Sequence, residues 1–242
     1  EIIVNEKRIA LLRDAPVMSS IIKMSLPVVM GMMVQVLYNL VDVFFVGMLH
    51  DPFQLAAVNL AAPVAMILMA IASVIGTGAA SYISRSIGEE KLQRASETLT
   101  TGLIACVAMG LLVTIVSLFG LTPIVNYLGA DSKTFAPTHS YVSIILLGSV
   151  LLMVNYAMGQ LLRAEGAMMS SMLGMFIGTV SNIILDPIFI FALHMGIRGA
   201  AIATVLGNTL GICFYIFCYV SGKSTLQIKG SLFSTNGTIW KE

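Results

Sequence analysis

Residues 52–84 read PFQLAAVNLAAPVAMILMAIASVIGTGAASYIS and contain no charged side chain. A helix needs about 20 consecutive apolar residues to cross a bilayer, so this stretch is long enough for a complete crossing. Further uncharged stretches lie on both sides of it, over 24–41, 98–130, 134–162, 166–185 and 199–222. The sequence therefore predicts an all-α, polytopic membrane protein with six transmembrane helices.

The composition agrees with this class and excludes others. Of the 242 residues, 57% are hydrophobic and only 10% are charged, whereas soluble chains carry about 25% charged residues. The net charge of +1 is too small to indicate a nucleic-acid partner. The three cysteines lie inside apolar runs without the spacing of a metal site, so we interpret them as packing residues. The expected surroundings are a lipid bilayer.

The distribution of basic residues predicts the orientation. We expect helices near 24–49, 55–83, 98–120, 138–161, 167–192 and 197–220. Of the 13 Lys and Arg residues, all but Lys133 and Arg198 fall on one side of these spans, and basic loops stay in the cytoplasm. The prediction is a multi-pass protein of the plasma (inner) membrane with both termini cytoplasmic. It has a cytoplasmic segment over 1–23, a six-helix lobe over 24–220 and a cytoplasmic linker over 221–242.

Two acidic residues interrupt the predicted spans. Asp42 and Asp186 each lie six or seven residues from the outer end of their helices, and Thr204 lies equally deep in the last helix. At 1.5 Å per residue, all three are roughly 10 Å below the outer boundary. Asn39 and Asn182 lie about one helical turn from the two acids. Carboxylate, amide and hydroxyl oxygens at one depth favour a site for H⁺ or Na⁺, with helix stapling as the alternative.

Two prolines are candidates for bending the acid-bearing helices. Pro27 lies near the inner end of the first helix, and Pro187 directly follows Asp186. A proline inside a helix removes one backbone hydrogen bond. A bend beside an ionisable group would couple protonation to helix shape, although membrane helices also tolerate proline without such a role.

Several motifs resemble the multidrug and toxic compound extrusion (MATE) transporters. They are Ser25-Leu-Pro27 through Tyr38-Asn39-Leu-Val-Asp42 to Gly47, then Gly76-Thr-Gly78-Ala-Ala-Ser-Tyr-Ile-Ser-Arg85, Gln160-Leu-Leu-Arg163-Ala-Glu-Gly166 and Asn182-Ile-Ile-Leu-Asp186-Pro187. The resemblance extends from residue 20 to 220 and is strongest to the DinF-like and MepA-like branch. It implies an antiporter that needs no cofactor and exports cationic, amphipathic drugs in exchange for H⁺ or Na⁺.

The resemblance also implies roles for individual residues. The family's cation site, for H⁺ or Na⁺, matches Asp42, Asn182, Asp186 and Thr204. The proline whose bending accompanies protonation in the family matches Pro27. Polar residues expected to line a substrate cavity are Gln35, Tyr38, Asn39 and Asn155.

Family members contain twelve helices in two lobes, whereas this sequence supplies the first six. Alternating access needs two halves that rock about a central site. We therefore expect a second six-helix lobe as a partner, with the assembly of two copies of this chain as the alternative. A lipid-linked sugar flippase of the same superfamily is the alternative function, but it would need basic residues in its cavity. An intramembrane aspartyl protease would also use two aspartates, but Val41 and Leu185 precede them here, in place of the residues of the protease motifs.

Overall fold

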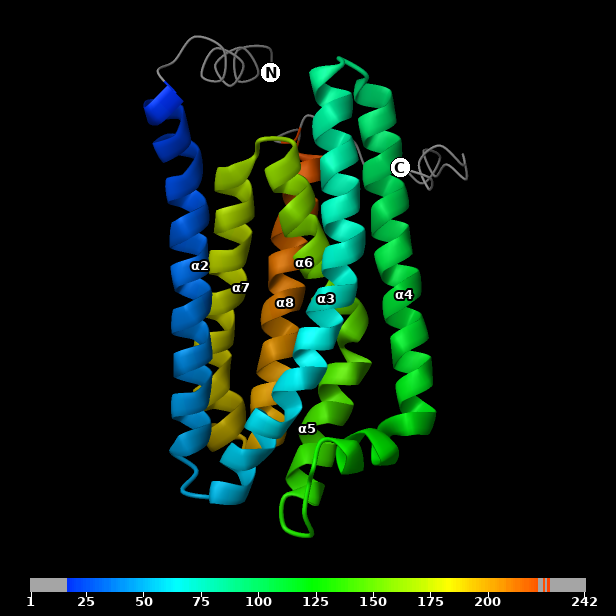
Figure 1. The fold of residues 1–242 in the computed structure, drawn as a ribbon. Helices are drawn as coiled ribbons and strands as arrows, with labels where there is room; N and C mark the ends of the chain where they lie inside the picture. Colours follow the sequence, from blue (N-terminus) through cyan, green and yellow to red (C-terminus); the bar gives the residue numbers. More distant parts are fainter. Residues whose placement is uncertain (1–16, 222–223, 225, 227–242) are drawn as a thin grey trace.

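The computed structural model describes residues 17–221, 224 and 226, and these form a bundle of long helices that run up and down (Figure 1). The elements are α2 (Val17–Gly47), α3 (Pro52–Gly88), α4 (Leu92–Tyr127), α5 (Phe135–Leu147), α6 (Ser149–Ala164), α7 (Met168–Pro187), the π-helical turn η1 (Ile188–Ala192) and α8 (Ile197–Val220). No strand occurs in the described part of the chain. The all-helical prediction is therefore confirmed.

The lengths of these helices fit a membrane. In the described residues, five helices are long and apolar enough to cross a bilayer, and the bent pair α5–α6 adds a sixth span when it is taken as one. Of the predicted terminal segments, residues 1–16 lie outside the described residues, as does the linker except at 221, 224 and 226. Residues 17–23 continue the first spanning helix into the predicted N-terminal segment.

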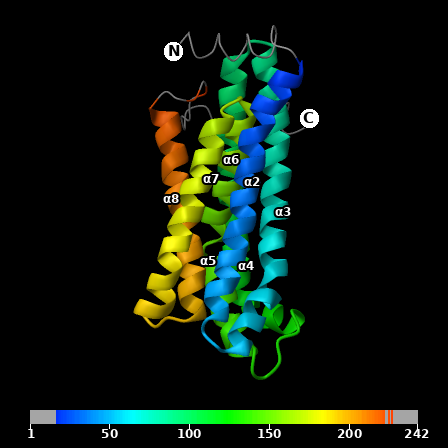
Figure 2. The same cartoon turned by 90° about the vertical axis from the view of Figure 1, so that its left-hand side faces the viewer.

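The turn between α2 and α3 has a sequence that ends one helix and begins the next. Asp51 is the N-cap of α3, and one of its carboxylate oxygens accepts the N–H of Phe53 at 2.9 Å. Pro52 occupies the first helical position, where its missing N–H costs nothing. The chain therefore reverses here within a few residues, and α3 returns alongside the bundle (Figures 1 and 2).

The fourth predicted span, 138–161, is broken into α5 and α6. The two helices meet at Gly148 with a bend of 55°. A Cβ atom on Gly148 would lie 2.5 Å from Cγ2 of Val205 in α8, so only glycine allows α8 to come this close. The break was not predicted, because the apolar pattern continues across it without interruption.

The third predicted span, 98–120, is longer than expected at both ends. Helix α4 runs from Leu92 to Tyr127 and contains Pro123. In Figure 1 the helix turns aside at its lower end. Pro123 lacks an N–H and leaves the carbonyl of Phe119 without its helical donor, which is a common cause of such a bend. The proline thus changes the direction of the helix and does not end it.

Helices α7 and α8 come into close contact through glycines. A Cβ atom on Gly207 would lie 2.7 Å from the carbonyl oxygen of Gly178 and 3.0 Å from Cβ of Asn182. Small residues of this kind let two backbones approach in a membrane. The close approach places the side chains of α7 next to those of α8, and α2 packs along the other side of α7 (Figure 2).

The buried apolar residues form two clusters, one toward each end of the bundle. The cluster at the α2–α3 turn contains Val46, Ile190 and Ala200, and the cluster at the opposite end contains Leu161 and Tyr215. Between Ala200 and Tyr215, α8 carries Thr204, Asn208 and Thr209 among apolar residues. The candidate site lies at this level of the bundle, which we call the polar layer.

Candidate cation-binding site

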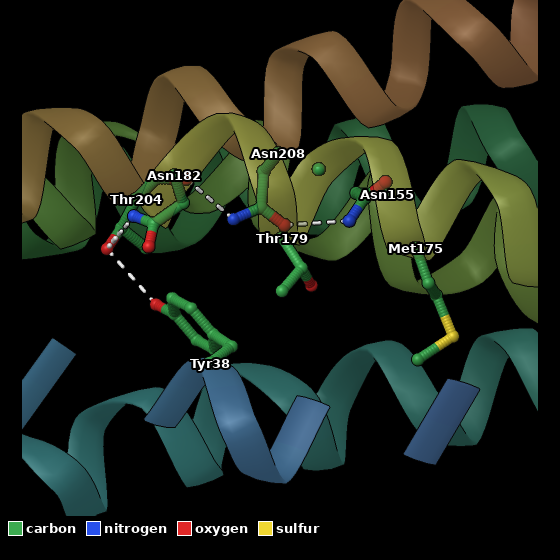
Figure 3. Close-up of a pocket in the computed structure, with 8 residues that line it drawn as sticks. Tyr38, Asn155, Met175, Thr179, Asn182, Thr204 and Asn208 are labelled. Atoms are coloured by element: carbon green, nitrogen blue, oxygen red, sulfur yellow. Dashed lines mark hydrogen bonds between the residues drawn. The ribbon is translucent and has the colours of Figure 1, made fainter. Parts of the chain in front are cut away.

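Side chains from three helices meet in this layer. Tyr38 and Asp42 come from α2, Asn182 and Asp186 from α7, and Thr204 from α8. The hydroxyl groups of Tyr38 and Thr204 are 3.2 Å apart and form a hydrogen bond that joins α2 to α8 (Figure 3). The structure thus brings together residues that are up to 166 positions apart in the sequence.

Asn182 links the aspartate of its own helix to α8. In the amide orientation that gives both its nitrogen and its oxygen a hydrogen-bond partner, Nδ2 donates to Oδ2 of Asp186 at 3.1 Å. The amide oxygen then accepts the N–H of Thr204 at 3.0 Å. Asn182 and Asp186 are one helical turn apart on the same face of α7. The amide therefore fixes the Asp186 carboxyl group with respect to Thr204.

Both carboxyl groups are buried. Asp186 is fully buried, and only 6% of Asp42 is exposed. Oδ1 of Asp42 has no hydrogen-bond partner within the described residues. The two carboxyl groups lie within electrostatic range of each other and of the Tyr38 and Tyr141 hydroxyls, and neither forms an ion pair with a described basic residue. Burying a charge without a partner is costly, so the pair needs protons or a bound cation.

A small polar pocket adjoins these residues. Its volume is about 60 Å³, which is room for about two water molecules. Its wall consists of Tyr38, Asn155, Met175, Gly178, Thr179, Asn182, Thr204 and Asn208 (Figure 3). Tyr38 and Asn155, two of the predicted cavity residues, lie on this wall. For the other two, Gln35 and Asn39, and for Pro27, the side chains lie outside the described residues.

Asn208, which was not predicted as a site residue, extends the polar layer. Asn208 accepts a hydrogen bond from Nδ2 of Asn155 at 2.7 Å and donates its own Nδ2 to the carbonyl oxygen of Thr204 at 2.7 Å. Oδ1 of Asn155 is buried and has no hydrogen-bond partner among the described residues. The signal was present in the sequence, because Asn208 lies four residues after Thr204 and therefore on the same helix face.

The backbone beside Asp186 is irregular. Helix α7 ends at Pro187, and the chain continues as the π-helical turn η1, in which the N–H of Leu193 donates to the carbonyl of Ile188 at 2.9 Å. Turns of this type are uncommon and are frequent at functional sites. Pro187 thus places a change of helix geometry directly next to the buried carboxyl group.

The oxygen atoms of the site are of the kind that hard cations prefer. Within the described residues, no three His, Cys, Asp or Glu side chains gather as they would around a transition metal. The carboxyl groups of Asp42 and Asp186, the amide of Asn182 and the hydroxyl of Thr204 offer oxygen atoms instead, and these suit a proton or a small alkali cation.

A bundle of apolar, membrane-length helices with buried carboxyl groups indicates an integral membrane protein with a functional site inside the membrane. Residues 27–188 match the model of the MatE family, and the chain belongs to this family of transporters. Its members are not enzymes, so the protease alternative does not apply.

Individual relatives agree with the assignment. The multidrug export protein MepA of Staphylococcus aureus (strain NCTC 8325 / PS 47) is 31% identical over 94% of this chain and 51% of its own length. A MOP superfamily transporter from Pyrococcus furiosus is 34% identical with a TM-score of 0.88, over 97% of this chain and 52% of the other. The outward-facing structure of a multidrug resistance MATE family transporter is 34% identical with a TM-score of 0.85, over 91% and 49%. The chain thus spans about half the length of these proteins.

Proposed function

We propose that this chain forms the first lobe of a cation-coupled exporter of cationic, amphipathic compounds. The observation that carries the proposal is the pair of buried carboxyl groups, Asp42 and Asp186, which lie in range of each other without a basic partner in the described residues. The similarity to a multidrug export protein supports the class of cargo. The cell membrane is the proposed location, with both termini in the cytoplasm.

The proposed coupling step is the occupation of this site by H⁺ or Na⁺. A proton on one carboxyl group, or a cation bound between the oxygens of Asp42, Asn182, Asp186 and Thr204, removes the repulsion between the two buried charges. Because Tyr38 joins α2 to Thr204 of α8, a change in this site alters how α2 is held. Bending of α2 at Pro27 and the irregular turn after Pro187 would let α2 and α7 follow.

Export needs a route across the membrane in addition to the coupling site. We propose that residues 24–220 form one lobe, that 221–242 lead toward a second six-helix lobe, and that the drug cavity lies between the two. The relatives, about twice as long as this chain, support this arrangement. Alternating access would then be a rocking of the two lobes.

The test is efflux of ethidium from cells that express the intact reading frame, at two external pH values. Asp186→Asn and Asp42→Asn are expected to abolish the pH dependence of efflux, because an amide neither binds a proton near neutral pH nor carries charge. Asp131→Asn is the matched control. Asp131 is exposed in the loop before α5, where its Oδ1 accepts the N–H groups of Lys133 and Thr134, and asparagine accepts the same bonds. Wild-type efflux in Asp186→Asn would disprove coupling at this site.

Flippase activity on anionic lipid-linked sugars is less well supported. No basic residue lies on the wall of the polar pocket. Arg163, at the inner end of α6, lies outside this wall but reaches it: its Nη1 contacts Sδ of Met175 at 3.9 Å and donates to Oγ of Ser171 at 2.8 Å. The Pyrococcus furiosus relative is described as having a binding pocket of reversed polarity that suggests a different function. An absence of efflux from every version of the protein would favour cargo of this other kind.

A further inference from the structure

A second cavity lies at the end of the bundle opposite to the C-terminal ends of α6 and α8. It is a groove of about 430 Å³ among the beginnings of α3, α5 and α8, at the lower end of the bundle in Figure 1. Each of the three helices contributes residues of its first turn to the wall, among them Phe53, Ala136 and Arg198. We call it the outer groove, following the orientation proposed above.

The two Lys and Arg residues that the structure describes at this end of the bundle, Lys133 and Arg198, line the outer groove. Nη2 of Arg198 donates to Oγ of Ser140 at 3.2 Å, and Nζ of Lys133 lies 5.3 Å from the centre of the Phe53 ring. Neither Lys133 nor Arg198 forms an ion pair with a carboxylate in the described part of the chain. Two positive charges that start from different loops thus lie on the wall of one hollow.

Asp51 offsets only part of the positive charge on the wall of the groove. Asp51 is the acidic residue on its wall, and the side chain of Gln54 and the N–H of Phe53 hold the pKa of Asp51 below its usual value. Asp51 therefore carries one negative charge against the two cations. Asp131 lies outside the wall, in the loop before α5, where bonds from Thr134 and Lys133 and the charge of Lys133 hold the pKa of its carboxyl group below the usual value. On the wall itself, two cations stand against the single carboxylate of Asp51.

The backbone adds to this positive field. The beginning of a helix carries a partial positive charge, and three helices begin here. The wall is held in place by Gln54, whose Oε1 accepts the N–H of Ile197 at 2.9 Å and whose Nε2 donates to Asp51 at 3.0 Å. Since this bond ties α3 to α8, the two sides of the groove have a fixed separation before any ligand arrives.

We propose that the outer groove binds the phosphate group of an anionic lipid headgroup. Lys133 and Arg198 would contact the phosphate oxygens, since a mobile ammonium and a planar guanidinium are the usual partners of phosphate. The groove lies where spanning helices begin, which is the level of the headgroups, and the half-exposed Phe53 ring gives an apolar edge toward the acyl chains. This proposal does not depend on the coupling ion or on the drug.

The experiment is native mass spectrometry of the purified full chain, titrated with phosphatidylglycerol or phosphatidylcholine. The double variant Lys133→Gln/Arg198→Gln is expected to weaken phosphatidylglycerol binding by about fivefold for each charge removed. Binding of the zwitterionic lipid should change less. The matched control is Lys91→Gln/Arg94→Gln at the other end of the bundle, where Lys91 is paired with the exposed Glu89 at 2.6 Å. This control should bind the lipid at the groove as the wild type does.

For a third variant we expect the opposite change, tighter binding of phosphatidylglycerol, without the removal of any side chain that contacts the phosphate. Asp51→Asn keeps the cap of α3 but removes the negative charge from the groove, so phosphatidylglycerol should bind more tightly than to the wild type. Equal binding by wild type, the groove double variant and Asp51→Asn would overturn the proposal. Displacement of the lipid by millimolar inorganic phosphate would assign the groove to free phosphate and would overturn the lipid assignment.

Discussion

Tyr38 is the residue that connects the first spanning helix with the carboxyl cluster. Its hydroxyl group bonds Oγ1 of Thr204, which in turn adjoins the amide of Asn182. Thr204 is buried, and a buried hydroxyl group that loses its hydrogen-bond partner destabilises the fold. The position of α2 relative to α8 therefore depends on this contact as well as on apolar packing.

Removing that hydroxyl group tests the connection. Tyr38→Phe keeps the ring and deletes the bond to Thr204, and we expect it to lower the free energy of unfolding by about 0.6 kcal/mol, the average for hydrogen bonds between membrane helices. Thermal unfolding of the purified protein measures the effect. Tyr127→Phe is the matched control, because the Tyr127 side chain is 94% exposed at the end of α4. Identical melting of the two variants would show that the Tyr38–Thr204 bond is not stabilising.

For single residues, the position along the helix axis was easier to predict from the sequence than the contacts with neighbouring helices. Counting residues from the predicted helix ends placed Asp42, Asp186 and Thr204 in one layer, because a helix has a fixed rise per residue. The rotation of each helix about its own axis is set by its neighbours and is not contained in such a count. For this reason the sequence could not identify Tyr141 as a member of the same polar layer, whereas Asn208, four residues after Thr204, was identifiable from helix periodicity.

At the level of elements, the close contact between α7 and α8 positions the site. Gly207 faces both the carbonyl of Gly178 and the Cβ of Asn182. An added methyl group must push α7 and α8 apart or displace Asn182, whose amide bridges Asp186 and Thr204. The geometry of the candidate cation site thus depends on a residue that offers no ligand atom.

We expect Gly207→Ala to destabilise the protein by about 1–3 kcal/mol, the usual cost of overfilling a well-packed contact. Denaturant or thermal unfolding measures it. The control is Gly78→Ala in α3, where a Cβ atom would meet nothing within 4 Å. Replacing an exposed glycine within a helix by alanine normally stabilises the protein, by up to about 1 kcal/mol. If Gly207→Ala melted as Gly78→Ala does, the close contact would be unimportant for stability.

The helices themselves were predictable to different degrees. Long uncharged stretches indicated the spans, because hydropathy alone decides which segments are stable in lipid. The break at Gly148 and the extension of α4 through Pro123 were not predicted. Both depend on whether a neighbouring helix compensates for an irregular backbone: Val205 approaches Gly148 closely, and α4 continues past its proline after a bend. A glycine or proline in the sequence indicates where a helix can become irregular, but it does not indicate whether the helix breaks there or bends and continues.

At the level of the whole molecule, the bundle has two chemically different ends. The described basic side chains Arg85, Lys91, Arg94 and Arg163 lie at the end where α3 and α6 finish, and Lys133 and Arg198 lie at the other. Because basic loops are retained in the cytoplasm, this asymmetry favours one orientation in the membrane. The candidate cation site lies nearer to the end with fewer basic residues, and a coupling ion that enters from outside would reach it over the shorter distance.

Labelling with a membrane-impermeant maleimide tests this orientation in intact cells. We expect Lys133→Cys to react from outside and Lys91→Cys to react only after the cells are permeabilised, since both side chains are exposed at opposite ends of the bundle. The background must lack Cys106, Cys213 and Cys218, so that each variant carries a single thiol. Reversed labelling would place both termini outside the cell. It would then turn the outer groove toward the cytoplasmic leaflet, where anionic lipids would still reach it, and would require the coupling ion to enter the site from the cytoplasm.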